Sequence, residues 1–374
     1  MSRILTINCG STSTKVAFFD DDRELARTSL DVPLAELATM PKVLDQTDYR
    51  TGQVRDFLAA SGLDAATADI VVARAGTIHH VKSDGAYAVN DLMVATLRYA
   101  PAAQHASALS CLIGKELVAG TDIPVIIYDP TCVDSVDEIA KVTGIPGIVN
   151  MPVYHLLNPK AMGHIYAESV GTDYADLNLV IAHLGGGITM AFHDHGRVVD
   201  WIYDDGGPMS PQRAGAIPTR YLTDFIYTSG MSHQQMRMFL AGKTGLAAHL
   251  GTQDLRDVEA LIDAGDVHAD LIYRAMAYGV AKGIGQLATV RAGKVDQIIL
   301  TGGIAYSTRF TALIRDLVEW IAPVTVLPGE NEMEALAAGG VRVLGGTEPV
   351  HDCDVFPPGY SSIEELVANP SFLA

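Results

Sequence analysis

The stretch Asn8-Cys9-Gly10-Ser11-Thr12-Ser13-Thr14-Lys15 lies between two apolar runs, at 3–7 and 16–19. The sequence therefore predicts a strand, a tight turn and a returning strand. Backbone N–H groups, hydroxyl side chains and the Lys15 ammonium group suit phosphate oxygens, but serine, threonine, glycine and asparagine are also ordinary turn residues. The stretch is either a phosphate-binding loop or a plain hairpin turn. It is not a Walker A loop, because Val16 follows the lysine.

Composition limits the class of protein and of partner. A chain of 374 residues is long enough for about two domains, each with its own core. Hydrophobic residues make up 48% and charged residues 19%, which is typical of a globular chain. The net charge of −18 repels nucleic acid and anionic membranes, so we expect neither as a partner. Positive charge at a phosphate site must come from a few placed side chains.

The cysteines and the first residues indicate a cytoplasmic protein. The cysteines are Cys9, Cys111, Cys132 and Cys353. They show no CxxC spacing, so free thiols in a reducing compartment are expected. The chain opens directly into an expected strand, without the pattern of a signal peptide. The longest weakly charged stretch, 99–114, contains proline, glutamine and histidine and is not expected to span a membrane.

The second half of the chain repeats the opening pattern. An apolar run at 179–183 leads into three consecutive glycines at 185–187 and then a second apolar run. Aligned with the opening, 183–186 falls over 8–11. This similarity predicts a duplicated strand–turn–strand unit, one copy in each half.

Other apolar segments alternate with helical ones, which favours an α/β architecture. Arg74 ends the short apolar run 70–73, a frequent position for site residues in such folds. A third glycine turn, Gly302-Gly303, follows the run 297–300 and precedes a helical segment. Backbone without side chains at that point allows a nucleotide to approach closely.

Taken in order, these motifs resemble the acetate and butyrate kinase family, within the actin, hexokinase and heat-shock chaperone superfamily. The resemblance rests on the Asn-x-Gly-Ser-Thr-Ser-Thr-Lys opening, His-Leu-Gly-Gly-Gly at His183, Leu-Thr-Gly-Gly at Leu300, and Gly-Pro-Met-Ser-Pro-Gln-Arg-Ala-Gly at 207–215. It covers about 3–344, and within the family the chain looks most like the butyrate kinases.

The resemblance implies a two-domain α/β fold of the actin-like ATPase type, with duplicated strand–turn–strand cores around a central cleft. Domain I is expected to contain 1–150 plus 333–374, and domain II 151–332. The resemblance also implies ATP and ADP with Mg²⁺ as cofactors, a homodimer, and a small carboxylic acid and its acyl phosphate as substrate and product.

The same resemblance assigns site residues by position. Those for the nucleotide and its phosphates are Asn8, Ser11, Ser13, Lys15, His183, Gly185, Gly186, Gly187, Asp254, Arg256, Gly302, Gly303 and Ile304. The catalytic residues are Arg74, Arg213, His155, Asp129 and His105. The metal-linked carboxylates are Glu332 and Asp129. The acid pocket contains Arg74, Gly76 and Tyr154.

The implied reaction is reversible transfer of the γ-phosphoryl group of ATP to butanoate. A carboxylate needs no general base at pH 7, so the site must mainly position the reactants and offset negative charge. Arg74 is expected to hold the carboxylate, and Arg213 the transferring phosphoryl group. His155 is expected to donate a hydrogen bond to the phosphoryl oxygens. Asp129 and Glu332 suit magnesium, which prefers oxygen ligands.

Each assignment has a structural alternative. The arginines can form surface ion pairs, and His105 and His155 can be structural. Glu332 can cap its helix, a role compatible with metal binding, and Lys15 can simply start a strand. Further histidines are expected in exposed turns rather than at a metal; they are His79, His80, His193 and His195.

Two departures from the family concern the choice of acid. Ala75 stands where butyrate kinases usually have glycine, and 77–85 differs from their proline- and glycine-rich version. Gly76 stands where acetate kinases carry a bulky residue, which favours butyrate or isobutyrate. Because one methylene discriminates by only ~1–3 kcal/mol, overlapping substrates are expected. The rival hypotheses are an acetate or propionate kinase, and a non-enzymatic, nucleotide-driven binding protein of the actin or chaperone type.

Overall fold

The computed structural model describes residues 2–74, 78–102 and 105–371. The chain forms two compact units: unit 1 comprises Met1–Asp134 with Asn331–Ala374, and unit 2 comprises Ser135–Glu330. Residues 135–150 therefore pack with unit 2. Within the described residues, no helix is both long and apolar enough to cross a membrane.

The sheet of unit 1 has seven strands in the order β12-β5-β6-β4-β1-β2-β3. In chain order these are β1 (Arg3–Cys9), β2 (Ser13–Asp20), β3 (Arg23–Asp31), β4 (Ile70–Arg74), β5 (Ala86–Ala88), β6 (Val125–Tyr128) and β12 (Val350–His351). The first three form an antiparallel meander, and β4 and β6 continue the sheet in the direction of β1. The strand, turn and strand predicted from the opening stretch are confirmed.

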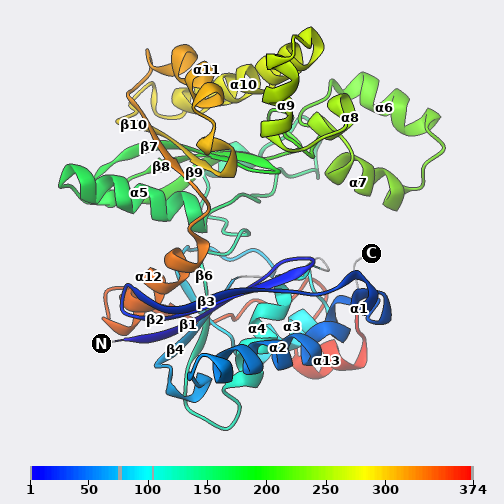
Figure 1. The fold of residues 1–374 in the computed structure, drawn as a ribbon. Coiled ribbons are helices and arrows are strands. Elements are labelled where there is room, and N and C mark those ends of the chain that lie inside the picture. The colour runs from blue at the N-terminus through cyan, green and yellow to red at the C-terminus, as the bar shows by residue number, and fades with distance from the viewer. Residues whose placement is uncertain (1, 75–77, 103–104, 372–374) are drawn as a thin grey trace. The chain divides into compact units, whose positions relative to one another are not determined.

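Helices cover both faces of this sheet (Figure 1). On one face lies α12 (Glu332–Leu344), and on the other lies α4 (Ala108–Leu117), against which α2 (Thr47–Ala60) packs. The remaining helices of unit 1 are α1 (Leu34–Thr39), η1 (Val43–Gln46), η2 (Ala65–Thr67), α3 (Asp91–Tyr99) and α13 (Ile363–Ala368). The backbone N–H of Ser107 donates to His105 Nδ1, and α4 begins at Ala108.

The sheet of unit 2 has five strands in the order β11-β10-β7-β8-β9. They are β7 (Asn178–Leu184), β8 (Ile188–Asp194), β9 (Arg197–Ile202), β10 (Gln297–Gly302) and β11 (Val324–Pro328). This order and these strand directions match β6-β4-β1-β2-β3 of unit 1. Each sheet also has a register shift at a corresponding place, at Phe18/Phe19 and at Phe192/His193. The predicted duplication is confirmed.

Each sheet has an equivalent hydrogen bond at the start of its first strand. Asp69 accepts from the backbone N–H of Arg3 at 2.7 Å, and Asp296 accepts from the backbone N–H of Asn178 at 2.7 Å. Arg3 begins β1 and Asn178 begins β7, so the aspartates fix equivalent strand starts. The duplication therefore extends beyond the turns that revealed it.

Helices cover both faces of the unit 2 sheet as well (Figure 1). The long α10 (Val267–Ala288) and α11 (Thr308–Val318) lie on one face, and α5 (Leu157–Val170) lies on the other. The remaining helices are η3 (Glu138–Lys141), η4 (Tyr174–Asp176), α6 (Thr219–Thr228), α7 (His233–Gly242), α8 (Gly245–Leu250), α9 (Leu255–Asp263), η5 (Thr289–Arg291) and η6 (Gly303–Tyr306). Between β7, β8 and α10 lies a core that includes Val180, Phe192 and Met276.

Each unit contains one helix that follows a strand of the other unit along the chain. Helix α5 follows β6 of unit 1 along the chain but packs on β7 and β10 of unit 2. Helix α12 follows β11 of unit 2 but packs on β1 and β4 of unit 1. Each sheet is thus covered by a helix that the other half of the chain introduces.

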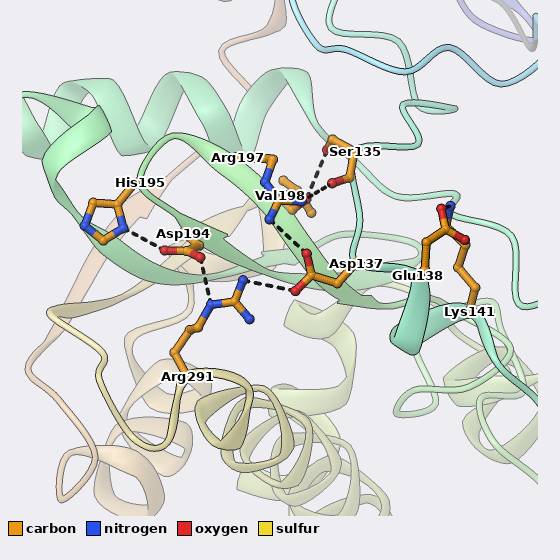
Figure 2. A network of polar contacts seen from close by, with 9 residues as sticks. All are labelled: Ser135, Asp137, Glu138, Lys141, Asp194, His195, Arg197, Val198 and Arg291. Atoms are coloured by element: carbon orange, nitrogen blue, oxygen red, sulfur yellow. Dashed lines mark hydrogen bonds and ion pairs between the residues drawn. The ribbon is translucent and has the colours of Figure 1, made fainter.

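A polar network fixes the first residues of unit 2 to its sheet (Figure 2). Arg291 donates to Asp194 at 2.7 Å and to Asp137 at 3.0 Å, and Arg197 donates to Asp137 at 2.8 Å. Partial burial alone would raise the pKa values of the two aspartates. The hydrogen bonds and charges around them outweigh burial and hold both pKa values below the usual range.

The prediction of exposed histidines is only partly correct. His195 lies exposed in the turn after β8. His193, by contrast, is fully buried in β8, and its Nδ1 lies 2.6 Å from the Tyr174 hydroxyl oxygen. His79 and His80 are half-buried and contact backbone carbonyl oxygens at 3.1 Å. Both faces of β8 are covered, so a side chain at this position is buried whichever face it lies on, in spite of its polar character.

Candidate functional site

In unit 1, the ends of β1 and β4 bring three predicted residues together. Asn8 lies near the end of β1, Arg74 ends β4, and Glu332 begins α12. The Asn8 amide donates to Glu332 Oε2 at 2.5 Å, and Arg74 Nε lies 3.4 Å from Glu332 Oε1. The parallel register of β1 and β4 puts the first two side chains at the same sheet edge.

Arg74 is arranged to receive an anion. The residue is only 8% exposed, and its Nη1 is buried without a hydrogen-bond partner among the described residues. Leaving such a donor unsatisfied costs about 1–3 kcal/mol. A carboxylate or phosphate oxygen would satisfy it through a charge-assisted hydrogen bond.

Asp129 lies beside Arg74 in the sheet, directly after β6. The register pairs Arg74 with Tyr128, so the aspartate follows immediately at the same edge. Asp129 is buried, has a positive φ of 44°, and accepts from the backbone N–H of Gly85 at 2.8 Å. One carboxylate oxygen is therefore engaged in holding the neighbouring loop.

Of two other predicted residues of unit 1, the structure describes His105 but not Gly76. His105 is exposed, and its Nδ1 accepts from the backbone N–H of Ser107 at 3.2 Å. An accepting Nδ1 leaves Nε2 as a possible donor. Gly76 and its neighbour Ala75 lie outside the described residues.

The turn between β1 and β2 has the form of an anion-binding loop. The backbone N–H of Gly10 donates to the Ser13 carbonyl oxygen at 2.8 Å and closes the turn. Ser11 and Thr12 are exposed, and their N–H groups have no acceptor among the described residues. Lys15 lies in β2 opposite Asn8. The turn thus offers N–H groups near the predicted phosphate residues.

The glycine turn of unit 2 closes in the same way. The backbone N–H of Gly185 donates to the Gly187 carbonyl oxygen at 3.1 Å, which repeats the bond of the first turn. A Cβ on Gly187 would lie 2.8 Å from the carboxylate of Asp204. That carboxylate accepts from the backbone N–H of Ile188 at 2.9 Å, and its burial raises the pKa of Asp204.

The tautomer of His183, at the end of β7, follows from its neighbour Asn158. The Asn158 Nδ2 lies 3.3 Å from the Gly329 carbonyl oxygen, 3.0 Å from the Thr301 hydroxyl and 3.2 Å from His183 Nδ1. A carbonyl oxygen can only accept, so the amide nitrogen is the atom that faces these partners. His183 Nδ1 therefore accepts, and Nε2 carries the ring proton as a donor.

His155 stacks on His183, with ring centroids 4.2 Å apart. Its Nδ1 lies 2.9 Å from the hydroxyl of Thr189, the residue opposite His183 in β8. Tyr154, predicted for the acid pocket, is buried directly before it. Unit 2 thus brings two predicted histidines into one stacked pair beside the glycine turn.

Arg213 faces the same turn from the segment after β9. Its Nε lies 3.6 Å from Asp204 Oδ2, and its Nη1 donates to the Ala241 carbonyl oxygen. The backbone N–H of Arg213 also donates to the Ser210 hydroxyl at 3.1 Å. The guanidinium is therefore held by protein groups on two sides.

The third glycine turn follows β10 and lies against the end of β7. Gly302 has a φ of 92°, and a Cβ there would lie 2.4 Å from the Leu184 carbonyl oxygen. Only glycine fits that position without strain. Gly303 faces open space, and Ile304 is buried behind it.

Asp254 and Arg256 form an ion pair at the N-terminus of α9. Asp254 is the N-cap of α9 and accepts from both the backbone and the side chain of Arg256. The Arg256 hydrogen bonds lower the pKa of Asp254 to about 2. The pair is largely exposed, so the structure accounts for it as a helix cap.

Comparison with known proteins agrees with this geometry. Residues 160–325 match the profile of the Acetokinase family. The sequence is 40% identical over 349 residues to probable butyrate kinase 2 of Caldanaerobacter subterraneus subsp. tengcongensis, which covers 93% of this chain and 98% of the relative. It is 42% identical over 349 residues to probable butyrate kinase of Coprothermobacter proteolyticus, with 92% and 98% covered. This chain belongs to the acetate and butyrate kinase family.

Solved structures confirm the fold expected of an acetate and butyrate kinase. The Porphyromonas gingivalis acetate kinase superposes with a TM-score of 0.72 at 18% identity, covering 92% of this chain and all 100% of the other. A propionate kinase from Francisella tularensis superposes with a TM-score of 0.70 at 18% identity, covering 91% and 99%. The predicted actin-like α/β fold with duplicated cores is thus confirmed.

Three buried polar residues that contact predicted site residues were not predicted from the sequence of this family member: Arg50, Asn158 and Asp204. Each lies behind a predicted residue rather than in a recognisable motif. Only the position of Arg50 could have been noticed in the sequence, because it has the helical spacing of Val54 and Leu58, which form the buried stripe of α2. A charged residue on such a stripe indicates a specific buried partner.

Proposed function

We propose that this protein is a short-chain fatty acid kinase that transfers the γ-phosphoryl group of ATP to butyrate and forms butyryl phosphate and ADP reversibly. Membership of the acetate and butyrate kinase family supports the reaction class. The observation that carries the proposal is the buried, unsatisfied Nη1 of Arg74 beside Asn8 and Glu332. This free donor of Arg74 could bind a small anion at the edge of the unit 1 sheet.

In the proposed reaction, a carboxylate oxygen attacks the γ-phosphorus while the bond to the ADP oxygen breaks. The carboxylate is already ionised, so no proton has to move before attack. Catalysis then depends on positioning and on donors that face the developing charge. We assign Arg74 to the carboxylate, because a guanidinium fork matches two carboxylate oxygens.

We assign the groups of unit 2 to the nucleotide. His183 supports this role with its Nε2 donor, and the turn at 185–187 supports it with its backbone. His155 and Arg213 are proposed for the oxygens of the transferring group. Gly302, with Gly303 and Ile304, is proposed for the adenosine, together with Asp254 and Arg256. In unit 1, Ser11, Ser13 and Lys15 are proposed for the outer phosphates, and His105 as a further donor.

Magnesium fits the carboxylates of unit 1. No group of three or more histidine, cysteine or acidic side chains in the described ranges could hold a metal alone. Magnesium bound with ATP needs only one or two carboxylates, because phosphates and waters supply the other ligands. Glu332 is partly accessible and oriented by Asn8, and Asp129 lies at the same edge. We propose both for the ion, which would offset phosphate charge when bound.

The preferred acid is proposed from the relatives named butyrate kinases, with acetate, propionate and isobutyrate as alternatives. The test incubates the enzyme and MgATP with acids of two to six carbons and traps acyl phosphate with hydroxylamine. We expect the highest kcat/KM with butyrate or isobutyrate. An optimum at acetate would overturn the butyrate assignment, and no hydroxamate with any acid would overturn the kinase. ATP turnover that responds to peptide or polymer but not to acids would favour the binding-protein alternative.

We also propose a homodimer in the cytoplasm. Helix α6 buries none of its residues and exposes Tyr221, Phe225, Ile226 and Tyr227, which favours a second copy of the chain as the covering partner. Light scattering should give twice the chain mass, and Tyr227→Asp should lower it. A monomer at micromolar concentration would overturn the dimer. The free, buried cysteines support a reducing compartment.

A further inference from the structure

A buried arginine lies directly behind the first turn. Arg50, in α2, is 0% exposed, and its Nε and Nη2 donate to Gln46 Oε1 at 3.0 and 2.8 Å. No carboxylate among the described residues pairs with it. A guanidinium stays charged under essentially all conditions in proteins, so a positive charge is buried here without an anionic partner.

The remaining donors of Arg50 hold the carbonyl groups of the turn. Nη1 donates to the carbonyl oxygens of Gly10 at 3.0 Å and Ser13 at 2.8 Å, and Nη2 donates to that of Ser11 at 2.9 Å. In a trans peptide the C=O and the following N–H point in opposite directions. Carbonyls drawn toward Arg50 therefore turn the N–H groups of Ser11 and Thr12 away from it, and these are the groups without an acceptor.

The second turn shows that this geometry does not require a cation. Gly186 aligns with Ser11, and its carbonyl oxygen accepts from the Ser210 hydroxyl at 2.7 Å and from the backbone N–H of Gln212 at 3.2 Å. Both donors are neutral, and a carboxylate, that of Asp204, lies behind this turn. A neutral donor would therefore be sufficient to hold the first turn as well.

Burial of a lone charge is unfavourable unless an opposite charge comes close. We propose that Arg50 is the positioning residue of the first turn and the buried counter-charge of the phosphates bound there: it fixes the carbonyls of Gly10, Ser11 and Ser13 so that the N–H groups of Ser11 and Thr12 meet the outer phosphates of ATP. This inference rests on the proposed function and names the residue behind its phosphate loop.

The test compares variants within one helix. Arg50→Met removes the charge and the donors, whereas Arg50→Lys keeps the charge with fewer donors. Val54→Ala truncates a fully buried residue one turn along the helix and serves as a destabilised control, because valine donates no hydrogen bond to the turn. Arg55→Met removes an exposed arginine paired with Glu116. For each variant we would measure the melting temperature, its rise with saturating ATP, ADP and AMP, and the kinetics for ATP and the acid.

Arg50→Met should lose about 10²-fold in kcat/KM for ATP, because a displaced loop misplaces the phosphates, while the KM for the acid changes little. The rise in melting temperature should fall for ATP and ADP and stay for AMP, which lacks the outer phosphates. Arg50→Lys should recover part of both effects. Val54→Ala should melt lower but keep the full rise with ATP, and Arg55→Met should match the wild type.

A purely structural Arg50 would give a different result. Arg50→Met would then resemble Val54→Ala, with a lower melting temperature, an undiminished rise with ATP and nearly normal kcat/KM, and the inference would be wrong. Equal weakening of ATP, ADP and AMP would also overturn it. Failure of the proposed function is distinguishable, because the wild type would then form no acyl phosphate, while the nucleotide-induced melting shifts would still decide the role of Arg50.

Discussion

Replacing Arg74 by methionine should separate its role in binding from its role in stability. Methionine occupies the space of the arginine stem as far as about Nε, so the change removes the guanidinium but keeps the packed part of the side chain. Arg74 contributes one loose ion pair, 3.4 Å from Nε to Glu332, and one buried Nη1 without a partner. These two features have opposite effects on the free energy of unfolding.

The expected effect on stability is small. Loss of the ion pair costs about 1–2 kcal/mol, since both groups are mostly but not fully buried and Glu332 keeps the Asn8 amide. Removal of the unsatisfied donor returns about 1–3 kcal/mol. The net change should lie between about 1 kcal/mol of destabilisation and about 2 kcal/mol of stabilisation, so the melting temperature should fall by no more than about 4 °C.

The expected effect on activity is large. A cation that stabilises charge in phosphoryl transfer is worth ~10³ in rate, or about 4 kcal/mol of activation free energy. Arg74→Met should therefore lose ~10³ in kcat/KM for the acid in the hydroxylamine assay while it melts near the wild-type temperature. Arg27→Met is a matched control, because Arg27 also pairs with a glutamate of α12 but is exposed.

One result would refute the reasoning. If Arg74→Met melts many degrees lower but keeps its kcat/KM, the arginine serves the packing of α12 and has no substrate. Loss of activity in Arg27→Met to the same extent would show that any disturbance of α12 inactivates the enzyme, and Arg74 would then have no special place.

Two further predictions concern unit 2. Gly302→Ala places a Cβ 2.4 Å from a backbone carbonyl oxygen of β7 at a φ of 92°. It should lower the free energy of unfolding in urea by more than about 2 kcal/mol. Gly303→Ala is the control: its Cβ would meet nothing within 4 Å, so the loss should be about 1 kcal/mol or less. The lowered pKa values of Asp137 and Asp194 mean that the Figure 2 network stabilises unit 2 above their usual pKa of 3.8 and loses its effect as the pH falls below it. Arg291→Met should lower the free energy of unfolding at pH 7 by about 1 kcal/mol for these partly exposed groups. The difference from the wild type should shrink as the pH falls below 3.8 and vanish below the lowered pKa values of both aspartates. An equal loss at neutral and acid pH would contradict the ionic origin.

Local patterns were sufficient to predict the parts of the fold that follow from local physics. The opening strands β1 and β2 are apolar runs that the fold buries almost completely. The repeat at 183–187 was recognisable because a close turn between paired strands limits the residues allowed there. These patterns depend on residues that lie close together along the chain, so they can be recognised in a single sequence without an alignment.

Other features depend on distant parts of the chain and could not be read from local pattern. Asn158 orients His183 from a different element, and the exchange of α5 and α12 between units is a property of topology. Arg50 breaks the expectation that a buried stripe is apolar, so pattern reasoning overlooked the residue that holds the predicted turn. The sequence located the turn between β1 and β2 but not the arginine that holds its carbonyl groups.

The duplication also explains where the polar groups of each half lie. Gly340 of α12 packs on Ile4, and Gly163 of α5 packs on Leu179, which occupies the equivalent strand position. Superposed in this way, the start of α12 corresponds to the residues just before α5. The exchanged helices therefore occupy equivalent places on the two sheets.

That correspondence pairs Asn8 with His183 and Glu332 with His155, so each half has one contact between the end of its first strand and the start of its exchanged helix. In unit 1 the contact contains a carboxylate with Arg74 beside it, and in unit 2 it consists of two stacked imidazoles. A carboxylate would repel phosphates but attracts a metal ion, whereas imidazole N–H groups can face phosphate oxygens directly. The two halves thus differ in charge at equivalent positions, which agrees with the acid and metal proposed for unit 1 and the nucleotide proposed for unit 2.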